Sequence, residues 1–276
     1  MAKHLNLFIP QWQDSGLTQE LYEGAYALRD YIESKNIIFS EIPISLSLDT
    51  TIENGIIGYN TIVKQLNMIS KLLEETKPDQ LFSIGGGCGI EIPLVSYLYK
   101  KYKGMDVIWF DAHGDLNTPD SSPSQYFHGM PLRFLLDNIP GNEISKKYNK
   151  INIDDVLLVG IRDLDDPEEE YIQINKIKMI KVNHSEIKNG LEIKKLLNKK
   201  NNNAYLHIDL DVLDPEIYKN VKCPTENGYT VEEIIKIINI IKSEKTIVGV
   251  SLLENIEKKD EEISKINELI DIGINL

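Results

Sequence analysis

The sequence predicts an α/β fold, a three-layer αβα sandwich in which helices cover both faces of a parallel sheet of about eight strands. Short β-rich runs alternate with helical patterns along the 276 residues, which is the order that parallel sheets require. Several of these runs are almost wholly apolar, as expected of strands that are buried on both faces. Because no low-complexity linker or internal repeat divides the chain, we expect a single domain over residues 1–276.

The strands are expected where apolar, β-branched or aromatic residues cluster between turn signals. A closed barrel of alternating strands and helices would also use eight strands, so the strand count leaves this architecture open beside the more natural sandwich. In chain order, the expected strands are Leu5–Pro10, Ile37–Pro43, Gln80–Ile84, Asp106–Phe110, Asp155–Val159, Lys178–Val182, Ala204–Ile208 and Thr246–Leu252.

Helices are expected where apolar residues recur at a spacing of three or four positions. Thr18 is the expected N-cap of one helix, which runs to about Ser34. A second helix is expected from Ile56 to Leu73, and Thr230 is expected to open a third.

Composition excludes several classes of partner. The formal net charge of −13 argues against nucleic acid and anionic membranes. The sequence contains no apolar run of 18 residues, so no transmembrane helix is expected. The two cysteines, Cys88 and Cys223, are expected as free thiols, which is typical of a reducing compartment. We therefore expect a cytoplasmic protein.

Chemically versatile residues directly follow four of the expected strands. In open α/β sheets, ligands bind in the crevice at the carboxyl ends of the strands. We therefore expect these four segments to meet in one crevice. They are the glycine-rich run Gly85–Gly89, the segment Asp111–Asp115, the segment Asp209–Asp211, and Glu254.

The spacing of the acids in two of these segments favours metal binding. Side chains at positions i and i+2 of an extended chain share a face, so Asp111, His113 and Asp115 can point the same way, as can Asp209 and Asp211. Carboxylates packed together without a cation resist ionisation. Oxygen ligands with an imidazole suit Mn²⁺ or a similar ion, and bridging carboxylates would hold two ions about 3.5–4 Å apart. Each segment alone is equally typical of a cap, a turn or a strand end.

The same residues stand in motifs that resemble those of a known family. The run Asp111-Ala112-His113-Gly114-Asp115 resembles the Asp-Ala-His-x-Asp motif of the arginase, agmatinase and formimidoylglutamase superfamily. His207–Pro215 is similar to its second metal motif, in which two aspartates precede a later Asp-Pro. Glu254 stands where the family keeps a glutamate, and His128-Gly129-Met130-Pro131 resembles its catalytic histidine loop. The four motifs keep the family order, which is far more specific than any one of them.

The resemblance implies an αβα fold and a centre of two Mn²⁺ ions. Asp111 and Asp209 would bridge the ions, His113 and Asp211 would complete one of them, and Asp115 would help to hold the other. The metals would lower the pKa of a bridging water.

The resemblance also implies the reaction, which is hydrolysis of the guanidino group of L-arginine to urea and L-ornithine. The hydroxide derived from the bridging water, oriented by Asp115, would attack the guanidinium carbon. Glu254 would hold the guanidinium by charge-assisted hydrogen bonds, and His128 would shuttle a proton.

Three residues favour an α-amino acid as substrate over its decarboxylated analogue. Asn117 follows the first metal motif as in the arginase branch, and Ser124 resembles the serine that helps to hold the α-carboxylate there. The segment Gly160–Asp165 looks like a segment of that branch whose last aspartate meets the α-amino group, which assigns this role to Asp165. Ordinary turn chemistry would also account for Asn117 and Ser124.

The glycine-rich segment departs from the family pattern. The family usually has Gly-Gly-Asp-His there, and this histidine binds one metal, whereas this chain has Gly87 and Cys88. Cys88 could bind metal as a thiolate, in which case its sulfur would favour Zn²⁺ or Fe²⁺ over Mn²⁺. Alternatively, this position is weak or empty and Cys88 is inert packing. Cys223 stands where arginases commonly have threonine, so the pocket wall differs as well.

Several functions therefore stay open. The same cysteine occurs in a branch of the family that hydrolyses Nω-hydroxy-L-arginine, which makes this compound an alternative substrate, and agmatinase or formimidoylglutamase activity is another alternative. The altered first motif also suits a member that has lost catalysis and binds a ligand. The resemblance further suggests a homo-oligomer.

Overall fold

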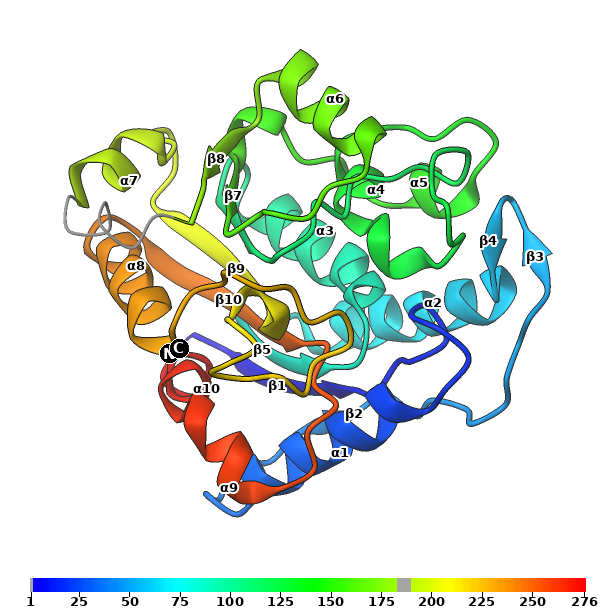
Figure 1. Cartoon of the computed structure of the whole chain (residues 1–276), viewed down its shortest axis with the longest axis horizontal. Coiled ribbons are helices and arrows are strands. Elements are labelled where there is room, and N and C mark those ends of the chain that lie inside the picture. The colour runs from blue at the N-terminus through cyan, green and yellow to red at the C-terminus, as the bar shows by residue number, and fades with distance from the viewer. Residues whose placement is uncertain (1, 183–189) are drawn as a thin grey trace.

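A parallel sheet of eight strands forms the centre of the molecule (Figure 1). The computed structural model describes residues 2–182 and 190–276. The strand order is β2-β1-β5-β10-β9-β6-β7-β8. The strands are β1 (His4–Ile9), β2 (Ser40–Glu41), β5 (Gln80–Gly85), β6 (Asp106–Phe110), β7 (Val156–Val159), β8 (Lys178–Ile180), β9 (Asn203–Asp209) and β10 (Thr246–Leu253).

Helices pack on both faces of this sheet, with α1, α8, α9 and α10 on one side and α2, α3 and α4 on the other (Figure 1). Alternate residues of a strand enter the two cores, so that Trp109 of β6 joins the core with α2 and α3 while Phe110 joins the core with α1 and α8. The helices are α1 (Glu20–Glu33), α2 (Tyr59–Thr76), α3 (Glu91–Lys101), α4 (Pro131–Leu136), α5 (Glu143–Lys147), α6 (Asp166–Asn175), α7 (Gly190–Leu196), α8 (Val231–Glu244), α9 (Asp260–Ile263) and α10 (Asn267–Ile274).

The sandwich predicted from the sequence is confirmed, and the closed barrel is wrong. Within the described residues, the terminal strands β2 and β8 each pair with one neighbour only, so the sheet is open. All eight predicted strands are present, but β2 and β8 are shorter than expected. Both lie at the sheet edge, where a strand gains hydrogen bonds from one side alone.

Two predicted helix starts are wrong. Gln19, not Thr18, is the N-cap of α1, and the Thr18 hydroxyl donates to the Glu20 side chain. Helix α2 begins at Tyr59, because the preceding residues form a hairpin of β3 (Ile52–Glu53) and β4 (Ile56–Ile57). Gly58 separates the hairpin from the helix in the left-handed conformation, with φ +69°. The predicted start of α8 is confirmed, since Thr230 and Glu233 form a capping box there.

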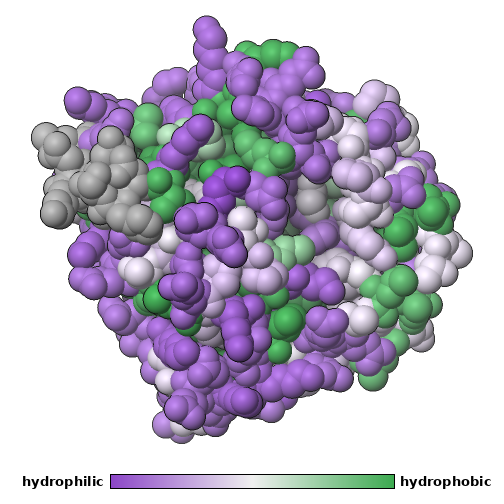
Figure 2. Space-filling model, viewed as in Figure 1, coloured by the Kyte–Doolittle hydropathy of each residue, from purple (hydrophilic) through white to green (hydrophobic). Residues whose placement is uncertain are grey.

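The surface seen in Figure 2 is mostly hydrophilic, as expected for a chain with a net charge of −13. Exposed apolar side chains gather at one edge of this face, over the β3–β4 hairpin and the segment before it. They include Leu46, Leu48 and Ile52. Among the helices of residues 2–182 and 190–276, none is long and apolar enough to cross a membrane.

Candidate metal centre

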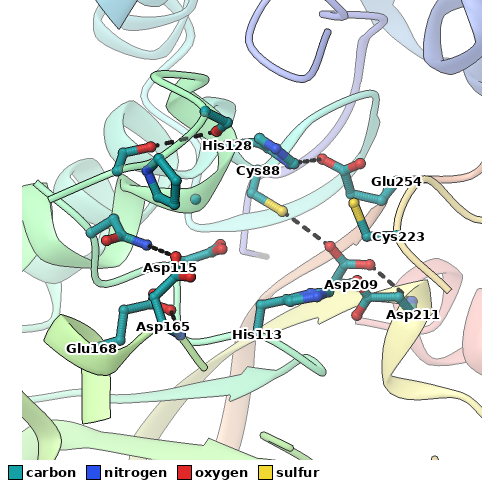
Figure 3. A pocket seen from close by; sticks show the side chains of 15 residues that line it. Cys88, His113, Asp115, His128, Asp165, Glu168, Asp209, Asp211, Cys223 and Glu254 are labelled. Carbon is teal, nitrogen blue, oxygen red and sulfur yellow. Dashed lines mark hydrogen bonds and ion pairs between the residues drawn. The ribbon is translucent and has the colours of Figure 1, made fainter. Parts of the chain in front are cut away.

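The four segments predicted to share a crevice do meet in one pocket. Their strands β5, β10, β9 and β6 are consecutive in the sheet and all parallel, so their carboxyl ends lie side by side. In Figure 3, the thiol of Cys88 lies between Asp115 on one side and Asp209 and Glu254 on the other. The pocket is lined by Cys88, His113, Asp115, Asn117, Ser122, Pro123, Ser124, His128, Gly129, Asp165, Glu168, Asp209, Asp211, Cys223 and Glu254.

One cluster of potential metal ligands, which we name the His113 cluster, consists of Asp111, His113 and Asp211. One ligand atom from each lies within 4.8 Å of the others. The His113 Nδ1 atom is 2.9 Å from Asp211 Oδ2 and 3.5 Å from Asp111 Oδ1. Both carboxylates are buried. Trp109 Nε1 donates a hydrogen bond to Asp111 Oδ2 at 3.2 Å, which helps to orient the Asp111 carboxylate.

A second set, which we name the Cys88 cluster, consists of Cys88, Asp111, Asp115 and His207, again with one ligand atom each within 4.8 Å. Asp111 is common to both clusters, as the predicted bridging role requires. Asp115 has φ +52°, which turns this residue out of the extended conformation that the i, i+2 argument assumed, yet its carboxylate still reaches the cluster.

A third set joins Cys88 to Asp209 and Glu254 within the same distance. The Cys88 thiol donates to Asp209 Oδ2 at 3.2 Å. Cys88 is therefore part of the core on the α2 and α3 side of the sheet, and its buried thiol lies among the predicted ligands.

Burial makes this concentration of negative charge unfavourable without a cation. Desolvation and the neighbouring carboxylates raise the pKa of Asp115 and Asp209 well above the ordinary value. Burial and Asp111 raise the pKa of Asp211 to about 6. Burial likewise opposes ionisation of Asp111, but the imidazoles of His113 and His207 beside it hold its pKa below the ordinary value. Cations would allow all four carboxylates to ionise together.

Glu254 and His128 form the part of the pocket wall next to Cys88 and Asp209. Glu254 follows β10 with φ +62°, and its backbone N–H donates to Gly86 O at 2.8 Å. His128 Nδ1 and Ser15 Oγ lie 3.5 and 3.1 Å from Glu254 Oε1. Within the described part of the chain, no group donates a hydrogen bond to the buried Oε2 atom. One carboxylate oxygen is thus left for a cationic ligand.

The residues predicted to recognise an α-amino acid lie together at the pocket mouth. Asn117 Nδ2 donates to Asp165 Oδ2 at 2.8 Å. Asp165 is the N-cap of α6 and shares a capping box with Glu168. The Ser124 hydroxyl lies 3.4 Å from that of Ser122 and accepts from Tyr126 N at 3.3 Å. All three predicted residues line the pocket.

Sequence reasoning missed several buried groups of this site. Asp14 follows β1, and its Oδ2 atom accepts from Gly89 N at 3.0 Å. A Cβ atom on Gly87 would lie only 2.2 Å from Asp14 Oδ1, so Asp14 occupies the space that a side chain at position 87 would need. The strand-end rule, applied to β1, would have found Asp14.

Glu91, Glu168 and His207 were also missed. Glu168 accepts from Leu116 N at 2.8 Å and from Asp165 N at 3.0 Å, and burial raises its pKa to about 7. The Asp165-x-x-Glu168 spacing was a signal for the capping box. His207 stands two positions before Asp209 in the same strand, so the i, i+2 rule would have identified it.

Comparisons with known proteins agree with this geometry. The sequence model of the arginase family matches residues 21–266. An arginase of Staphylococcus aureus (strain MRSA252) is 31% identical over 209 residues, which cover 73% of this chain and 69% of that protein. Arginases of other Staphylococcus aureus strains are 34% identical, but the match covers only 56% of their length. The hepatic arginase of Aquarana catesbeiana is 28% identical over 253 residues, or 87% of this chain and 76% of that protein.

Solved structures share the fold over nearly the whole chain. Arginase from Bacillus caldovelox superposes with a TM-score of 0.82 at 24% identity and covers 98% of this chain and 97% of its own. Arginase of Entamoeba histolytica, solved with L-ornithine, has a TM-score of 0.82 at 23% identity over 96% and 97% of the two chains. At this identity the likeness concerns the fold, whereas the family match covers most of the sequence. The chain belongs to the arginase family.

Proposed function

We propose that the protein is a metal-dependent amidinohydrolase that hydrolyses L-arginine to urea and L-ornithine. The observation that carries this proposal is the pair of ligand clusters that share Asp111, next to a pocket in which Glu254 has an Oε2 atom that accepts no hydrogen bond from any described residue. Family membership supports a ureohydrolase acting on a small guanidino compound.

Residues present in the pocket fit two divalent ions. His113, Asp211, Asp111 and Asp209 would hold one ion, and Asp115, Cys88, Asp111 and Asp209 would hold the other. Asp115 Oδ2 is buried, and no described residue donates a hydrogen bond to it, which is the condition expected of a ligand atom without its cation. We propose Mn²⁺ as the principal ion because carboxylates dominate the donor set. When bound, divalent ions act as Lewis acids that lower the pKa of water toward neutrality.

The protein's own side chains would bind and orient the substrate around these ions. Glu254 would accept charge-assisted hydrogen bonds from the guanidinium through its free oxygen. His128, 3.5 Å from Glu254, would carry a proton toward the departing amino group, because the carboxylate beside it favours the imidazolium form. Asp115 would orient the attacking water through its carboxylate.

At the pocket mouth, the α-amino and α-carboxylate groups would meet polar partners. Asp165 would bind the α-ammonium, while Ser124 and Asn117 would donate hydrogen bonds to the α-carboxylate. Agmatine has no α-carboxylate, so these two contacts favour an amino acid.

Nω-hydroxy-L-arginine is a second candidate substrate. Cys88 and Cys223 both line the pocket, and Cys88 lies within one ligand set with Glu254. The two cysteines stand where the family usually has histidine and threonine, so the pocket wall near the guanidino group differs from the family pattern. The added hydroxyl of Nω-hydroxy-L-arginine would lie next to this part of the wall.

The deciding experiment is a substrate panel. We expect urea from L-arginine with added Mn²⁺, and the same panel includes Nω-hydroxy-L-arginine, agmatine and formimidoyl-L-glutamate. The Asp209→Asn variant should lose turnover, while the exposed acid Asp154, changed to Asn, serves as the matched control. Absence of turnover on every compound with Mn²⁺, Zn²⁺, Fe²⁺ and Co²⁺ would refute the amidinohydrolase and favour a ligand-binding member that has lost catalysis.

We further propose that the protein works in the cytoplasm as a homo-oligomer. Both cysteines are free thiols in the described structure, in keeping with a reducing compartment. Sedimentation equilibrium would test the oligomeric state.

A further inference from the structure

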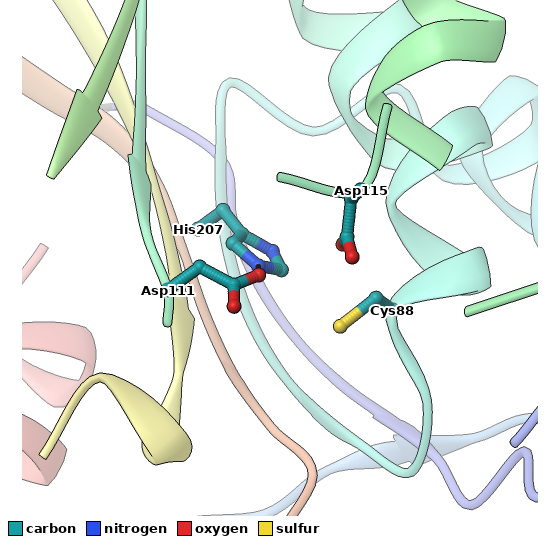
Figure 4. A group of neighbouring side chains, drawn as sticks. All are labelled: Cys88, Asp111, Asp115 and His207. Atoms are coloured by element: carbon teal, nitrogen blue, oxygen red, sulfur yellow. Dashed lines mark ion pairs between the residues drawn. The ribbon is translucent and has the colours of Figure 1, made fainter. Parts of the chain in front are cut away.

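The imidazole missing from the glycine-rich motif is supplied in space by another strand. His207 lies on β9, two residues before Asp209, and is fully buried with 0% of its surface exposed. Its ring stacks on Trp109, with the ring centroids 3.6 Å apart and the planes at 15°. Figure 4 shows the ring beside Asp111, with Asp115 and Cys88 facing the same space.

Both ring nitrogens of His207 are without a hydrogen bond from any described residue. The nearest acceptors are Asp111 Oδ2, 3.5 Å from Nε2, and Glu91 Oε1, 3.7 Å from Nδ1. Buried polar atoms in folded proteins nearly always have a partner. A bound cation would give this imidazole a partner, because Cys88, Asp111 and Asp115 each place a potential ligand atom within 4.8 Å of it.

We propose that His207 is a metal ligand and completes the position formed by Cys88, Asp111 and Asp115. This inference rests on the proposed metal binding. It goes beyond that proposal because it adds His207 to the predicted ligands, which were Cys88, His113 and the aspartates. One atom from each of the four residues already lies within 4.8 Å of the others. The imidazole thereby takes over from the histidine that Cys88 replaces in the chain.

Glu91, the first residue of α3, is the positioning residue for this ligand. Its side chain is fully buried, and within residues 2–182 and 190–276 neither carboxylate oxygen accepts a hydrogen bond. Histidines that bind metal through one nitrogen usually donate the other N–H to a carboxylate. Nε2 faces Asp111 and Nδ1 faces Glu91, so we assign Nε2 to the metal and Nδ1–H to Glu91.

The two metal positions then differ in chemistry. The His113 cluster offers two carboxylates and one imidazole, which suits Mn²⁺. The Cys88 cluster adds a thiolate, and sulfur with imidazole favours borderline ions such as Zn²⁺ or Co²⁺. We therefore expect the Cys88 cluster to select Zn²⁺ or Co²⁺ from a mixture with Mn²⁺.

The test uses full-length, metal-free protein titrated with Co²⁺. Coordinated imidazoles are counted by their paramagnetically shifted, exchangeable N–H proton signals, and bound metal is measured by mass spectrometry. We expect two shifted imidazole signals in the unchanged protein, from His113 and His207. His207→Gln should remove one signal and weaken one of the two Co²⁺ sites by at least about tenfold, and Glu91→Gln should weaken the same site by about tenfold or more.

The matched control is His4→Gln. His4 lies at the start of β1, at the opposite end of the sheet, and its Nε2 atom is 2.6 Å from Asn6 Oδ1. This variant should keep both signals and both sites. The signal count in the unchanged protein answers the question even where the His207 variant does not fold.

The possible outcomes are distinct. A single coordinated imidazole in protein that binds Co²⁺, or unchanged affinity in His207→Gln, overturns the assignment of His207 and leaves the proposed function standing. Failure of the unchanged protein to bind any of Mn²⁺, Co²⁺ or Zn²⁺ overturns both.

Discussion

The Cys88 thiol donates a hydrogen bond to Asp209, with Sγ 3.2 Å from Oδ2. Burial, together with Asp115 and Asp209, raises the pKa of this thiol well above its ordinary value, so it keeps its proton in the absence of a cation. A coordinating cation deprotonates a thiol. Without a cation, the Cys88 thiol is therefore protonated and donates to Asp209. With a cation bound beside it, Cys88 would be a thiolate ligand.

Replacing Cys88 by histidine should strengthen Mn²⁺ binding. An imidazole is a better ligand for this ion than a buried thiol, and we expect the affinity of the weaker site to rise by about tenfold. Calorimetric titration of metal-free protein with Mn²⁺ measures the change. Cys223→Ser is the matched control, because Cys223 lines the same pocket outside the ligand clusters. Unchanged Mn²⁺ affinity in Cys88→His would show that residue 88 does not bind the metal.

Restoring the family's aspartate at position 87 should destabilise the protein. A Cβ there would lie 2.2 Å from Asp14 Oδ1 and 2.4 Å from Ser15 Oγ, and the new carboxylate would be buried beside an existing one. We expect Gly87→Asp to lower the free energy of unfolding by about 3 kcal/mol or more. Adding Asp14→Gly should recover much of this loss, because it removes the competing carboxylate. Chemical denaturation of the unchanged protein, the two single variants and the double variant gives the coupling energy between positions 14 and 87. Strictly additive changes in the free energy of unfolding would show that the two side chains do not compete for space.

The metal-free protein should lose stability as the pH rises from 5 to 8. Burial raises the pKa of Asp14 to about 6 and that of Glu168 to about 7. A group with a raised folded-state pKa contributes stability that is complete below its unfolded pKa and is lost as the pH rises through the folded value. Thermal unfolding at a series of pH values measures this trend. Glu168→Gln should flatten the upper part of the curve, and an unaltered curve would exclude Glu168 as a cause.

Changing His128 to asparagine should lower kcat with little effect on metal content. General acid–base catalysis typically contributes about 10²–10⁴-fold, so we expect a loss in this range. His128 contacts Glu254 and lies outside the ligand clusters, so both ions should remain bound. Steady-state urea release and metal analysis on the same sample separate the two effects. A variant with full kcat would remove His128 from the proposed mechanism.

Much of the fold could be predicted because it depends on local patterns. Apolar runs such as Asp106–Phe110 identify buried strands wherever their partners lie. The lengths of the edge strands were overestimated. The strand predicted over residues 37–43 shortens to Ser40–Glu41, which pairs with β1 alone. The start of α2 was misplaced because Ile56 continues the apolar spacing of Tyr59 and Ile62, although it pairs with Glu53 in the hairpin.

The predicted metal ligands and Glu254 lie close together because each stands at or shortly after the carboxyl end of one of four neighbouring parallel strands. The missed groups depend on contacts between segments that are distant in the sequence. Glu91 and His207 meet only because α3 packs on the face of the sheet that His207 occupies, and Asp14 reaches Gly87 from another strand end. No local pattern specifies such pairs, although the strand-end position of Asp14 and the spacing of His207 were visible signals.

We propose that the buried carboxylates of the pocket hold cations. Metal analysis of protein purified without chelator, alongside Asp209→Asn and the Asp154→Asn control, tests it most directly. We predict close to two divalent ions per chain in the unchanged protein and in the control, and clearly fewer in Asp209→Asn. Unchanged protein that carries no metal, and takes up none when Mn²⁺ or Zn²⁺ is added, would show that these carboxylates do not form a metal centre.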